Sequence, residues 1–383
     1  MILSGGGTAG HIYPALALAD ELSSRKVDLL YAGTSSGPEL HLASEAGLAF
    51  AAISSAGFDR ARPLSLLSSG AKALKGVFQA MGLLRREKPS AVVCFGGYVS
   101  VPVGIAAWLR KVPLVVHEQN SHMGMTNRFL ASRAQFIALT YPKTAGLPSK
   151  LKAEVAFLGN PVRGSVQDAD SSRARALFDI PDTAKILLVF GGSRGARKIN
   201  QATVAALSTF LSKRDRWHII HGTGQAEYDS VMQDVQEVFE RSPELQSRYH
   251  ALPYIENMGD VLVAADLVVS RAGATSIAEL TALGKPSVLV PYPYATDDHQ
   301  TTNAQALLAL GGARLIADSK LAVPEEGYTS GTDCVETSPY RDTLLELTGD
   351  EQALKTMAER AATLGKRDAA AKLAEAILEL ARN

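Results

Sequence analysis

The hydrophobic positions of the chain follow two alternating spacings. Short, nearly continuous apolar runs, such as "VDLLYAG", "AVVCFGGY" and "VPLVVHEQN", are separated by longer stretches with a helical spacing, such as residues 66–87. Continuous apolar runs are typical of strands buried on both faces, and the stretches between them predict helical crossovers. The first half of the chain is therefore expected to form a parallel sheet covered by helices.

The second half repeats this pattern after a loop-rich stretch, "LGNPVRGSVQDAD". It opens with "AKILLVFGGSRGARKINQAT", in which an apolar run again leads into a glycine-rich turn and a helical pattern. We expect two doubly wound α/β domains with parallel sheets, residues 1–162 and 163–365, and an Ala-rich helix at about 366–383 that returns to the first domain. Such sheets bind ligands at the carboxyl ends of their strands, so the domains are expected to face each other across a cleft.

The composition narrows the class of protein. The 383 residues are 46% hydrophobic and 20% charged, as in a globular enzyme, and their formal net charge of +0 gives no overall attraction to nucleic acid. Two cysteines are too few for a disulfide framework and fit a reducing compartment. The chain shows neither a secretory signal nor the run of about 20 apolar residues that a transmembrane helix needs. A cytoplasmic protein is expected, and a peripheral position on a membrane stays open.

Three glycine-rich turns follow predicted strands. Gly5–Gly10 matches the Gly-x-Gly-x-x-Gly pattern, and Gly96–Gly97 and Gly191–Gly195 end two further strands. At such junctions backbone N–H groups and the positive end of a helix point at an anion. One glycine turn is as easily structural, but three of them indicate more than one phosphate group. A nicotinamide cofactor is disfavoured, because the second strand ends in "YAGT" without the acidic residue that would hold a ribose.

Several polar side chains near these turns are candidates for chemistry. His11 could accept a proton from a hydroxyl, or could simply pack at the start of its helix. Glu279 could accept both hydroxyls of a ribose, or could lie solvated on its helix. The runs "HEQN" and "DDHQTTNA" suit hydroxyl and amide recognition. Asp168 and Asp170 form an Asp-x-Asp pair but follow no strand, so a helix cap is favoured and no metal is expected.

One predicted helix carries an apolar stripe with basic neighbours. The apolar members recur at helical spacing: Leu67, Ala71, Leu74, Phe78 and Met81. The basic residues lie among them or follow them: Lys72, Lys75, Arg85, Arg86 and Lys88. Such a stripe usually packs in a core, and with basic neighbours it could instead rest on an anionic membrane.

Seven stretches between residue 5 and about residue 312 resemble, in the same order, those of the MurG family of peptidoglycan glycosyltransferases. They are "GGGTAGHIYPALALAD", "GGYVSVP", "HEQNSHMGMTNRFLA", "GNPVR", "GGSRGARKIN", "SRAGATSIAEL" and "DDHQTTNA". The resemblance implies the GT-B architecture of two Rossmann-like domains and an inverting transferase. This enzyme would move N-acetylglucosamine from UDP-N-acetylglucosamine to the 4-hydroxyl of undecaprenyl-pyrophosphoryl-N-acetylmuramyl-pentapeptide (lipid I), giving β-1,4-linked lipid II without an essential metal. The resemblance also implies a peripheral position on the cytoplasmic side of the cell membrane, and other cell-wall synthesis proteins as candidate partners.

The same resemblance implies roles for individual residues. His11 is the candidate base, although another group could remove the proton. The acceptor is expected to contact Gly7, Thr8, Gly10, Gly96, Gly97 and Tyr98. The donor is expected to contact Thr8, Ala9, Gly10, His11, Asn120, Arg163, Ser193, Ile255, Ala274, Thr275, Glu279 and Gln300. The membrane is expected to contact Leu67, Leu74, Phe78 and Trp108.

The sequence departs from the family pattern at two places. Ala9 stands where the commoner form "GGTGGH" has its second glycine, and residues 319–340 form a polar segment longer than the usual connection, for which no function is assigned. Two rival functions remain. A UDP-N-acetylglucosamine 2-epimerase would share the fold and the donor but need no lipid acceptor, and a non-catalytic scaffold of the cell-wall machinery would only bind the sugar nucleotide.

Overall fold

The computed structural model describes residues 1–56, 65–192, 195–295, 298–321 and 338–382, without the side chains of residues 65–69. The side chain of Leu67, the whole of Ser193 and most of the polar segment 319–340 therefore lie outside what the structure describes. The chain divides into two compact units. The N-terminal unit comprises Met1–Gly164 and Lys366–Asn383, and the C-terminal unit comprises Ser165–Gly365.

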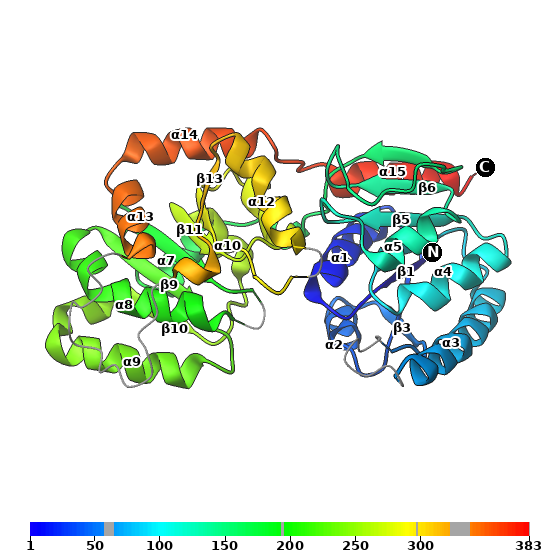
Figure 1. The fold of residues 1–383 in the computed structure, drawn as a ribbon, viewed down its shortest axis with the longest axis horizontal. Coiled ribbons are helices and arrows are strands. Elements are labelled where there is room, and N and C mark those ends of the chain that lie inside the picture. Colours follow the sequence, from blue (N-terminus) through cyan, green and yellow to red (C-terminus); the bar gives the residue numbers. More distant parts are fainter. Residues whose placement is uncertain (57–64, 193–194, 296–297, 322–337, 383) are drawn as a thin grey trace. The chain divides into compact units, whose positions relative to one another are not determined.

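The N-terminal unit is built on a seven-stranded sheet, and all of its paired strands are parallel. The strands, in chain order, are β1 (Ile2–Gly5), β2 (Leu30–Gly33), β3 (Ala49–Ala52), β4 (Val92–Gly96), β5 (Leu114–Glu118), β6 (Phe136–Leu139) and β7 (Glu154–Phe157), and their order in the sheet is β3-β2-β1-β4-β5-β6-β7. Its longer helices are α1 (Ala9–Ser24), α2 (Pro38–Glu45), α3 (Ser65–Glu87), α4 (Ser100–Leu109), α5 (Met125–Ala131) and α15 (Ala369–Leu380) (Figure 1).

The sheet of the N-terminal unit is covered on both faces. Alternate residues of its central strands point to opposite sides, so Val92 packs with α3 and α4, whereas Val93 packs with α1, α2 and α15. This explains the continuous apolar runs in the sequence, because a strand between two helical layers has no solvated face. The last helix, α15, lies on α1 and contributes Leu373 and Ile377 to the core of this unit.

The C-terminal unit repeats the design with a six-stranded parallel sheet. The strands are β8 (Lys185–Phe190), β9 (Trp217–Gly222), β10 (Tyr249–Leu252), β11 (Leu267–Ser270), β12 (Ser287–Leu289) and β13 (Ala313–Leu315), in the order β10-β9-β8-β11-β12-β13. The helices are α6 (Gly164–Gln167), α7 (Ser171–Leu177), α8 (Arg197–Lys213), α9 (Tyr228–Arg241), α10 (Met258–Ala264), α11 (Ala274–Ala282), α12 (His299–Ala309), α13 (Pro339–Thr348) and α14 (Glu351–Ala362), with short 3₁₀ turns at Pro243–Arg248 and Asp318–Lys320. The two doubly wound parallel sheets predicted from the sequence are confirmed.

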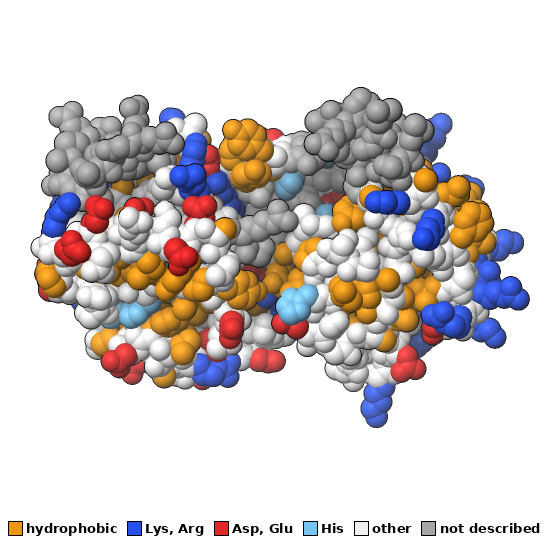
Figure 2. Space-filling view, turned by 90° about the horizontal axis from the view of Figure 1, so that it is seen from below, with side chains coloured by type: hydrophobic (Ala, Val, Ile, Leu, Met, Phe, Trp, Pro, Cys, Tyr) orange, Lys and Arg blue, Asp and Glu red, His pale blue; other side chains and the backbone are white. Residues whose placement is uncertain are grey.

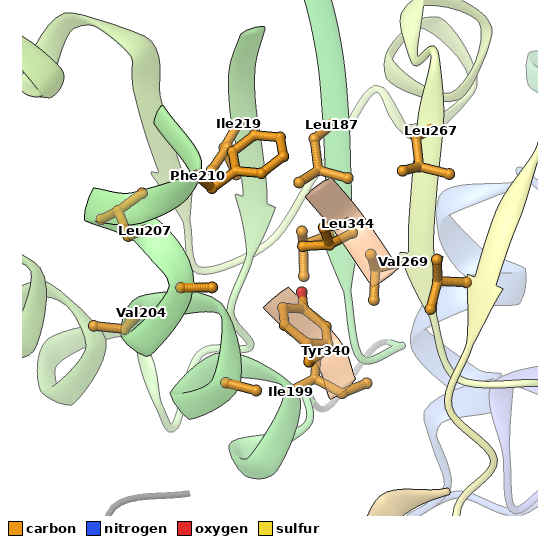
Figure 3. Close-up of a cluster of buried hydrophobic side chains, with 14 of the residues drawn as sticks. Leu187, Ile199, Val204, Leu207, Phe210, Ile219, Leu267, Val269, Tyr340 and Leu344 are labelled. Atoms are coloured by element: carbon orange, nitrogen blue, oxygen red, sulfur yellow. The ribbon is translucent and has the colours of Figure 1, made fainter. Parts of the chain in front are cut away.

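Helix α13 completes the core on one face of the second sheet. Figure 3 shows Tyr340 and Leu344 from this helix among apolar side chains of α8, β8 and β11. The Tyr340 side chain is fully buried, and its hydroxyl lies 2.8 Å from the Thr203 hydroxyl on α8. This hydrogen bond compensates for burying the two polar groups.

Each sheet reverses its strand order beside its first strand. In the N-terminal unit β1 lies between β2 and β4, and in the C-terminal unit β8 lies between β9 and β11. Parallel α/β sheets bind ligands at such a reversal, where the loops leave in opposite directions from the carboxyl ends of two neighbouring strands. The predicted glycine turns after β1, β4 and β8 are at these two positions.

Candidate active site

The site in the N-terminal unit begins with two glycine turns in direct contact. The turn after β1 passes against the turn after β4, where the Gly6 N–H donates to the Gly96 carbonyl at 3.3 Å. Gly97 has φ +79°, and a Cβ atom there would overlap the Gly6 carbonyl oxygen. Only glycine combines this left-handed conformation with so close an approach. The two turns therefore form one rigid backbone surface at the point where the strand order reverses.

His11 lies against this surface in the first turn of α1. Its Nδ1 atom is 3.0 Å from the Gly6 carbonyl oxygen and 3.3 Å from the Thr8 hydroxyl. A carbonyl oxygen only accepts hydrogen bonds, so Nδ1 carries the proton and Nε2 is the basic nitrogen of the neutral ring. A Cβ on Gly96 would lie 3.2 Å from Nε2, which places that edge of the ring over the second turn. These contacts fix the orientation of the ring and leave Nε2 as its unprotonated nitrogen.

A buried carboxylate, that of Glu39 on α2, supports the first turn. Glu39 is fully buried and accepts hydrogen bonds from the Gly7 N–H at 3.3 Å, the Thr34 N–H at 3.0 Å and the Thr34 hydroxyl at 2.6 Å. A Cβ on Gly6 would lie only 2.7 Å from the carboxylate. The Glu39 side chain therefore fills the space between the ends of β1 and β2. A dinucleotide would need this space for its ribose and phosphate groups.

This arrangement refines the role expected for Gly7. Its N–H donates to Glu39, so in this structure that N–H is directed away from an external anion. Gly7 has φ +80°, and a Cβ there would lie 3.2 Å from the Tyr98 ring. Gly7 therefore contributes space and backbone shape beside Tyr98. Sequence analysis missed Glu39, although an acidic residue six positions after β2 was the available signal.

The residues of the run His117–Asn120, at the end of β5, have two different roles. Buried side chains hold the loop in place, and Asn120 lies at its surface. Glu118 is buried and accepts from the N–H groups of Asn120 and Gly124 at 3.0 Å each, and from the Asn127 amide at 2.8 Å. His117 is fully buried, its Nε2 atom donates to the Gly159 carbonyl at 3.0 Å, and burial lowers its pKa to about 4. These side chains fix the loop, and Asn120 is the half-buried member of the run that the loop presents.

The site in the C-terminal unit begins at the turn after β8. Gly195 leads through Ala196 into α8, a helix of 17 residues, so the first N–H groups of this helix and its positive end lie at the carboxyl edge of the sheet. Gly195 has φ +76°, and a Cβ there would overlap the Thr223 carbonyl oxygen at the end of β9. Arg163, expected at the donor, belongs to the N-terminal unit, where its guanidinium lies 4.3 Å from the centre of the Tyr13 ring.

The loop after β11 brings further predicted residues to the same edge. Ala274 and Thr275 begin α11, and the Thr275 hydroxyl is buried without a hydrogen-bond partner among the described residues. Glu279 is only 4% exposed, which excludes the solvated alternative left open by the sequence. Ile255 is buried against Gly222, and the Gln300 side-chain oxygen accepts from the Tyr292 N–H at 2.9 Å. Polar groups of α11 and α12 therefore lie at the carboxyl edge of the second sheet.

A buried ion pair that sequence analysis missed ties this loop to α8. Arg271, the first residue after β11, contacts Asp318 at 2.6 Å, and Lys198 on α8 contacts the other Asp318 oxygen at 3.0 Å. Burial alone would raise the pKa of Asp318, but the hydrogen bonds and charges of Arg271 and Lys198 lower it. The Arg271 guanidinium also donates to the Val290 and Pro291 carbonyls at 3.2 Å. Among the described residues, no three His, Cys, Asp or Glu side chains converge as a metal cluster would require.

The N-terminal unit exposes an apolar face on three neighbouring helices. We define the apolar face by its exposed side chains on α3, α4 and α5: Leu74, Phe78, Trp108, Leu109, Met125 and Phe129. The guanidinium of Arg133 lies 5.5 Å from the Trp108 ring centre and 4.1 Å from that of Phe129. Figure 2 shows hydrophobic side chains beside Lys and Arg on this unit. Among the described residues, no helix is long and apolar enough to cross a bilayer.

The predicted stripe of α3 is thereby assigned to the surface. Phe78 is 67% exposed and Leu74 is 60% exposed, whereas the helix packs inward through Gly76, Ala80 and Leu83. A Cβ on Gly76 would overlap the Ser54 carbonyl oxygen, so small residues set how closely α3 approaches the sheet. The core alternative is wrong for Leu74 and Phe78, whereas Met81 is partly buried and packs against the core of this unit.

Comparisons with known proteins identify one family along nearly the whole chain. The model of the glycosyltransferase family 28 N-terminal domain matches residues 1–139, and that of the family 28 C-terminal domain matches residues 186–373. A UDP-N-acetylglucosamine–N-acetylmuramyl-(pentapeptide) pyrophosphoryl-undecaprenol N-acetylglucosamine transferase of Desulforamulus reducens is 40% identical over 370 residues, which cover 96% of this chain and 95% of the relative. Transferase 1 of the same name in Bacillus cereus is 38% identical over 384 residues, which cover 100% of this chain and 99% of the relative.

Solved structures give the same fold. The crystal structure of Acinetobacter baumannii MurG has a TM-score of 0.72 and 27% identity, with 99% of both chains covered. A putative UDP-N-acetylglucosamine 2-epimerase from Listeria monocytogenes has a TM-score of 0.70 but 13% identity, with 98% of this chain and 95% of that chain covered. The second likeness is one of fold alone.

Proposed function

The chain belongs to glycosyltransferase family 28 and to its MurG branch, and on that premise we propose that it transfers N-acetylglucosamine from UDP-N-acetylglucosamine to lipid I. The observation that carries this proposal is the identity of 38–42% with transferases of one name, which extends over 84–100% of this chain. The acceptor is undecaprenyl-pyrophosphoryl-N-acetylmuramyl-pentapeptide, and the product is the β-1,4-linked disaccharide of lipid II. The epimerase alternative has support only from folds that are 13–14% identical.

The proposed reaction is a single displacement with inversion. The 4-hydroxyl oxygen of the muramyl sugar attacks the anomeric carbon of the α-linked donor, the bond from that carbon to the UDP oxygen breaks, and UDP leaves with the electron pair. The proton of the attacking hydroxyl passes to Nε2 of His11. The hydrogen bond from His11 Nδ1 to the Gly6 carbonyl supports this role, because it fixes both the tautomer and the orientation of the ring.

We assign the acceptor to the N-terminal unit and the sugar nucleotide to the C-terminal unit. The rigid surface of Gly6, Gly96 and Gly97 would receive the acceptor pyrophosphate beside Thr8 and Tyr98. Asn120 would contact the sugars next to His11.

In the C-terminal unit, the N-terminal end of α8 and Ser193 would meet the donor diphosphate, and Arg163 is assigned to the same diphosphate. Glu279 would accept the ribose hydroxyls, and the buried Thr275 hydroxyl supports a ligand at the same helix end. The Ile255 backbone would contact the uracil, and Gln300 the hydroxyls of N-acetylglucosamine. The N-terminal ends of helices and the Arg163 guanidinium would stabilise the negative charge that develops on UDP. We therefore propose that no metal ion is essential.

The apolar face would bring the enzyme to its lipid-linked acceptor. Exposed Phe78, Trp108 and Met125 can enter the boundary between lipid head groups and acyl chains, while Arg133 and the basic residues of α3 remain at the anionic surface. We therefore propose a peripheral position on the cytoplasmic side of the cell membrane.

The test is transfer of labelled N-acetylglucosamine to lipid-linked muramyl-pentapeptide in the presence of EDTA. Label in the lipid fraction supports both the transferase and its independence from metal, and activity only after Mg²⁺ is added would contradict the second point. A parallel reaction without acceptor is examined for the 2-epimer of the sugar nucleotide. Epimer formation without lipid labelling would favour the epimerase, and donor binding without either product would favour the scaffold.

A further inference from the structure

A chain of buried hydrogen bonds connects the interior of the C-terminal unit to the glycine turn after β8. His221 on β9 lies 2.7 Å from the Tyr249 hydroxyl through Nδ1, and 3.1 Å from the Asn200 side-chain oxygen through Nε2. The Asn200 amide nitrogen lies 2.8 Å from the Thr223 carbonyl oxygen. His221 and Thr223 are fully buried, Asn200 is 1% exposed and Tyr249 is 7% exposed. The chain spans α8, β9, β10 and the loop after β9.

The direction of every hydrogen bond in this chain is determined by its last member. The Thr223 carbonyl can only accept, so Asn200 must turn its NH₂ group toward it and its oxygen toward His221. His221 Nε2 must then carry the proton, and Nδ1 must accept from the Tyr249 hydroxyl. Burial favours the same neutral ring, because it lowers the pKa of His221 to about 3. A single arrangement of protons thus satisfies four side-chain and backbone groups.

The Thr223 carbonyl in turn limits where the glycine turn can lie. The Cα atom of Gly195 packs so closely against this oxygen that a Cβ would overlap it, and the Asn200 N–H donates to the Ala196 carbonyl at 2.9 Å. Asn200 is therefore linked to Gly195 through the Thr223 carbonyl and lies one helical turn after the N-cap residue Ala196. A shift of the Thr223 carbonyl would move the backbone of Gly195 at the start of α8.

We propose that Asn200 and His221 are positioning residues that hold Gly195 and the first turn of α8 in the geometry that binds the diphosphate of the sugar nucleotide. This inference rests on the proposed function, because it takes a nucleoside diphosphate as the ligand of that turn. Neither residue touches the ligand. Their effect is selective for the diphosphate, since the uracil and ribose are assigned to Ile255 and Glu279 on other loops.

The test compares two ligands in the full-length protein. UDP binding is measured by calorimetry and uridine binding by an NMR titration, for the unaltered protein and for Asn200→Asp. The aspartate keeps the shape of the side chain but presents an oxygen to the Thr223 carbonyl, which repels it. We expect the Kd for UDP to rise at least tenfold and the Kd for uridine to change less than twofold. Equal changes for both ligands, or no change for UDP, would overturn the proposal.

Tyr340→Phe is the matched control. It removes a buried hydrogen bond to Thr203 on the same helix, 2.8 Å long, without a contact to Thr223. We expect a lower Tm with the Kd for UDP unchanged within twofold. A tenfold loss of UDP affinity in this control would mean that general loosening of α8 explains the effect, and would overturn the proposal.

Gly195→Ala provides a second test in case the buried aspartate prevents folding. The added methyl group displaces the turn from the Thr223 carbonyl and leaves the buried chain of hydrogen bonds intact. The same selective loss of UDP affinity is expected, and unchanged UDP binding would overturn the proposal. An unaltered protein that binds no UDP at all would instead overturn the proposed function, and this inference with it.

Discussion

The imidazole of His11 and the carbonyl of Gly6 are joined by a hydrogen bond of 3.0 Å. The bond links the candidate base to the glycine turn whose shape Glu39 and Gly96 determine. The turn after β1 therefore does two things: its backbone forms part of the surface assigned to the acceptor, and its Gly6 carbonyl sets which nitrogen of the base is available. Loss of the acceptor surface should appear in the KM for the acceptor, and loss of the base should appear in kcat.

His11→Ala should lower kcat by about a hundredfold or more, because the reaction loses its general base. The Kd for UDP should stay within about threefold, since the donor is assigned to the other unit. His11→Asn, which can still donate to the Gly6 carbonyl, should lose the same kcat. A His11→Asn variant with near-normal kcat would show that the contact with Gly6, and not proton removal, is what the reaction needs.

Glu39→Gln should destabilise the N-terminal unit by about 2 kcal/mol. The glutamine NH₂ group would face an N–H group that now donates a hydrogen bond to a Glu39 oxygen, and that bond would be lost. The KM for the lipid acceptor should rise, while the Kd for UDP should not change. Urea unfolding and steady-state kinetics measure these effects. Glu45→Gln, on the exposed end of the same helix, serves as the control and should change the free energy of unfolding by less than about 0.5 kcal/mol.

Replacing Leu74 and Phe78 together by serine should reduce binding to vesicles that contain phosphatidylglycerol by at least about tenfold. Each side chain transferred from water to the lipid boundary contributes about 1.5–3 kcal/mol at full burial, and about 1.4 kcal/mol corresponds to a tenfold change. Vesicle sedimentation measures the bound fraction. Leu177→Ser removes a side chain of similar exposure, 63%, from the C-terminal unit and should leave vesicle binding unchanged.

Glu279→Gln should raise the Kd for UDP by about tenfold, because the carboxylate is expected to accept two ribose hydroxyls and the amide can accept fewer. The Kd for 2′-deoxy-UDP should rise less, since that ligand lacks one of the hydroxyls. Competition binding with both nucleotides measures the difference. Equal losses for the two ligands would contradict the ribose assignment.

The free energy of unfolding should fall as the pH is lowered below about 6.5. The pKa values of His117 and His221 are lowered to about 4 and about 3 in the folded protein, from 6.5. Between these values and 6.5 the unfolded chain binds more protons than the folded one, so acid favours unfolding. Urea titrations from pH 7.5 to 4.5 measure the slope. His221→Gln removes one of these sites, and its stability should depend less steeply on pH over the same range.

The sequence predicted the structure well where a single residue type or a single spacing determines the local conformation. The apolar runs predicted the central strands because those strands are buried on both faces, and the glycine-rich stretches predicted the carboxyl ends of β1, β4 and β8. The sequence was less informative where burial depended on partners far along the chain. Glu39 and Glu118 are hidden by backbone N–H groups of their folded loops, which no spacing of residues reveals.

The apolar stripe of α3 left two interpretations open, a core face and a membrane face, and the sequence could not decide between them for a related reason. Large apolar residues usually mark the packed side of a helix, but α3 packs through Gly76 and Ala80 because the neighbouring backbone at Ser54 leaves no space for larger groups. The face that α3 turns toward the core is therefore set by the close approach of the backbone at Ser54. Hydrophobicity alone pointed to the opposite face.

The packing of α15 against α1 has a consequence for how the protein is made. A nascent chain that has left the ribosome as far as Gly365 holds every strand of both sheets, yet it lacks Leu373, Ala374 and Ile377, which cover α1 in the finished N-terminal unit. The unit whose strands are made first is thus the last whose core can close. Until α15 has been made, the uncovered side of α1 is a surface on which a chaperone could act, and the order of synthesis is reversed in the order of completion.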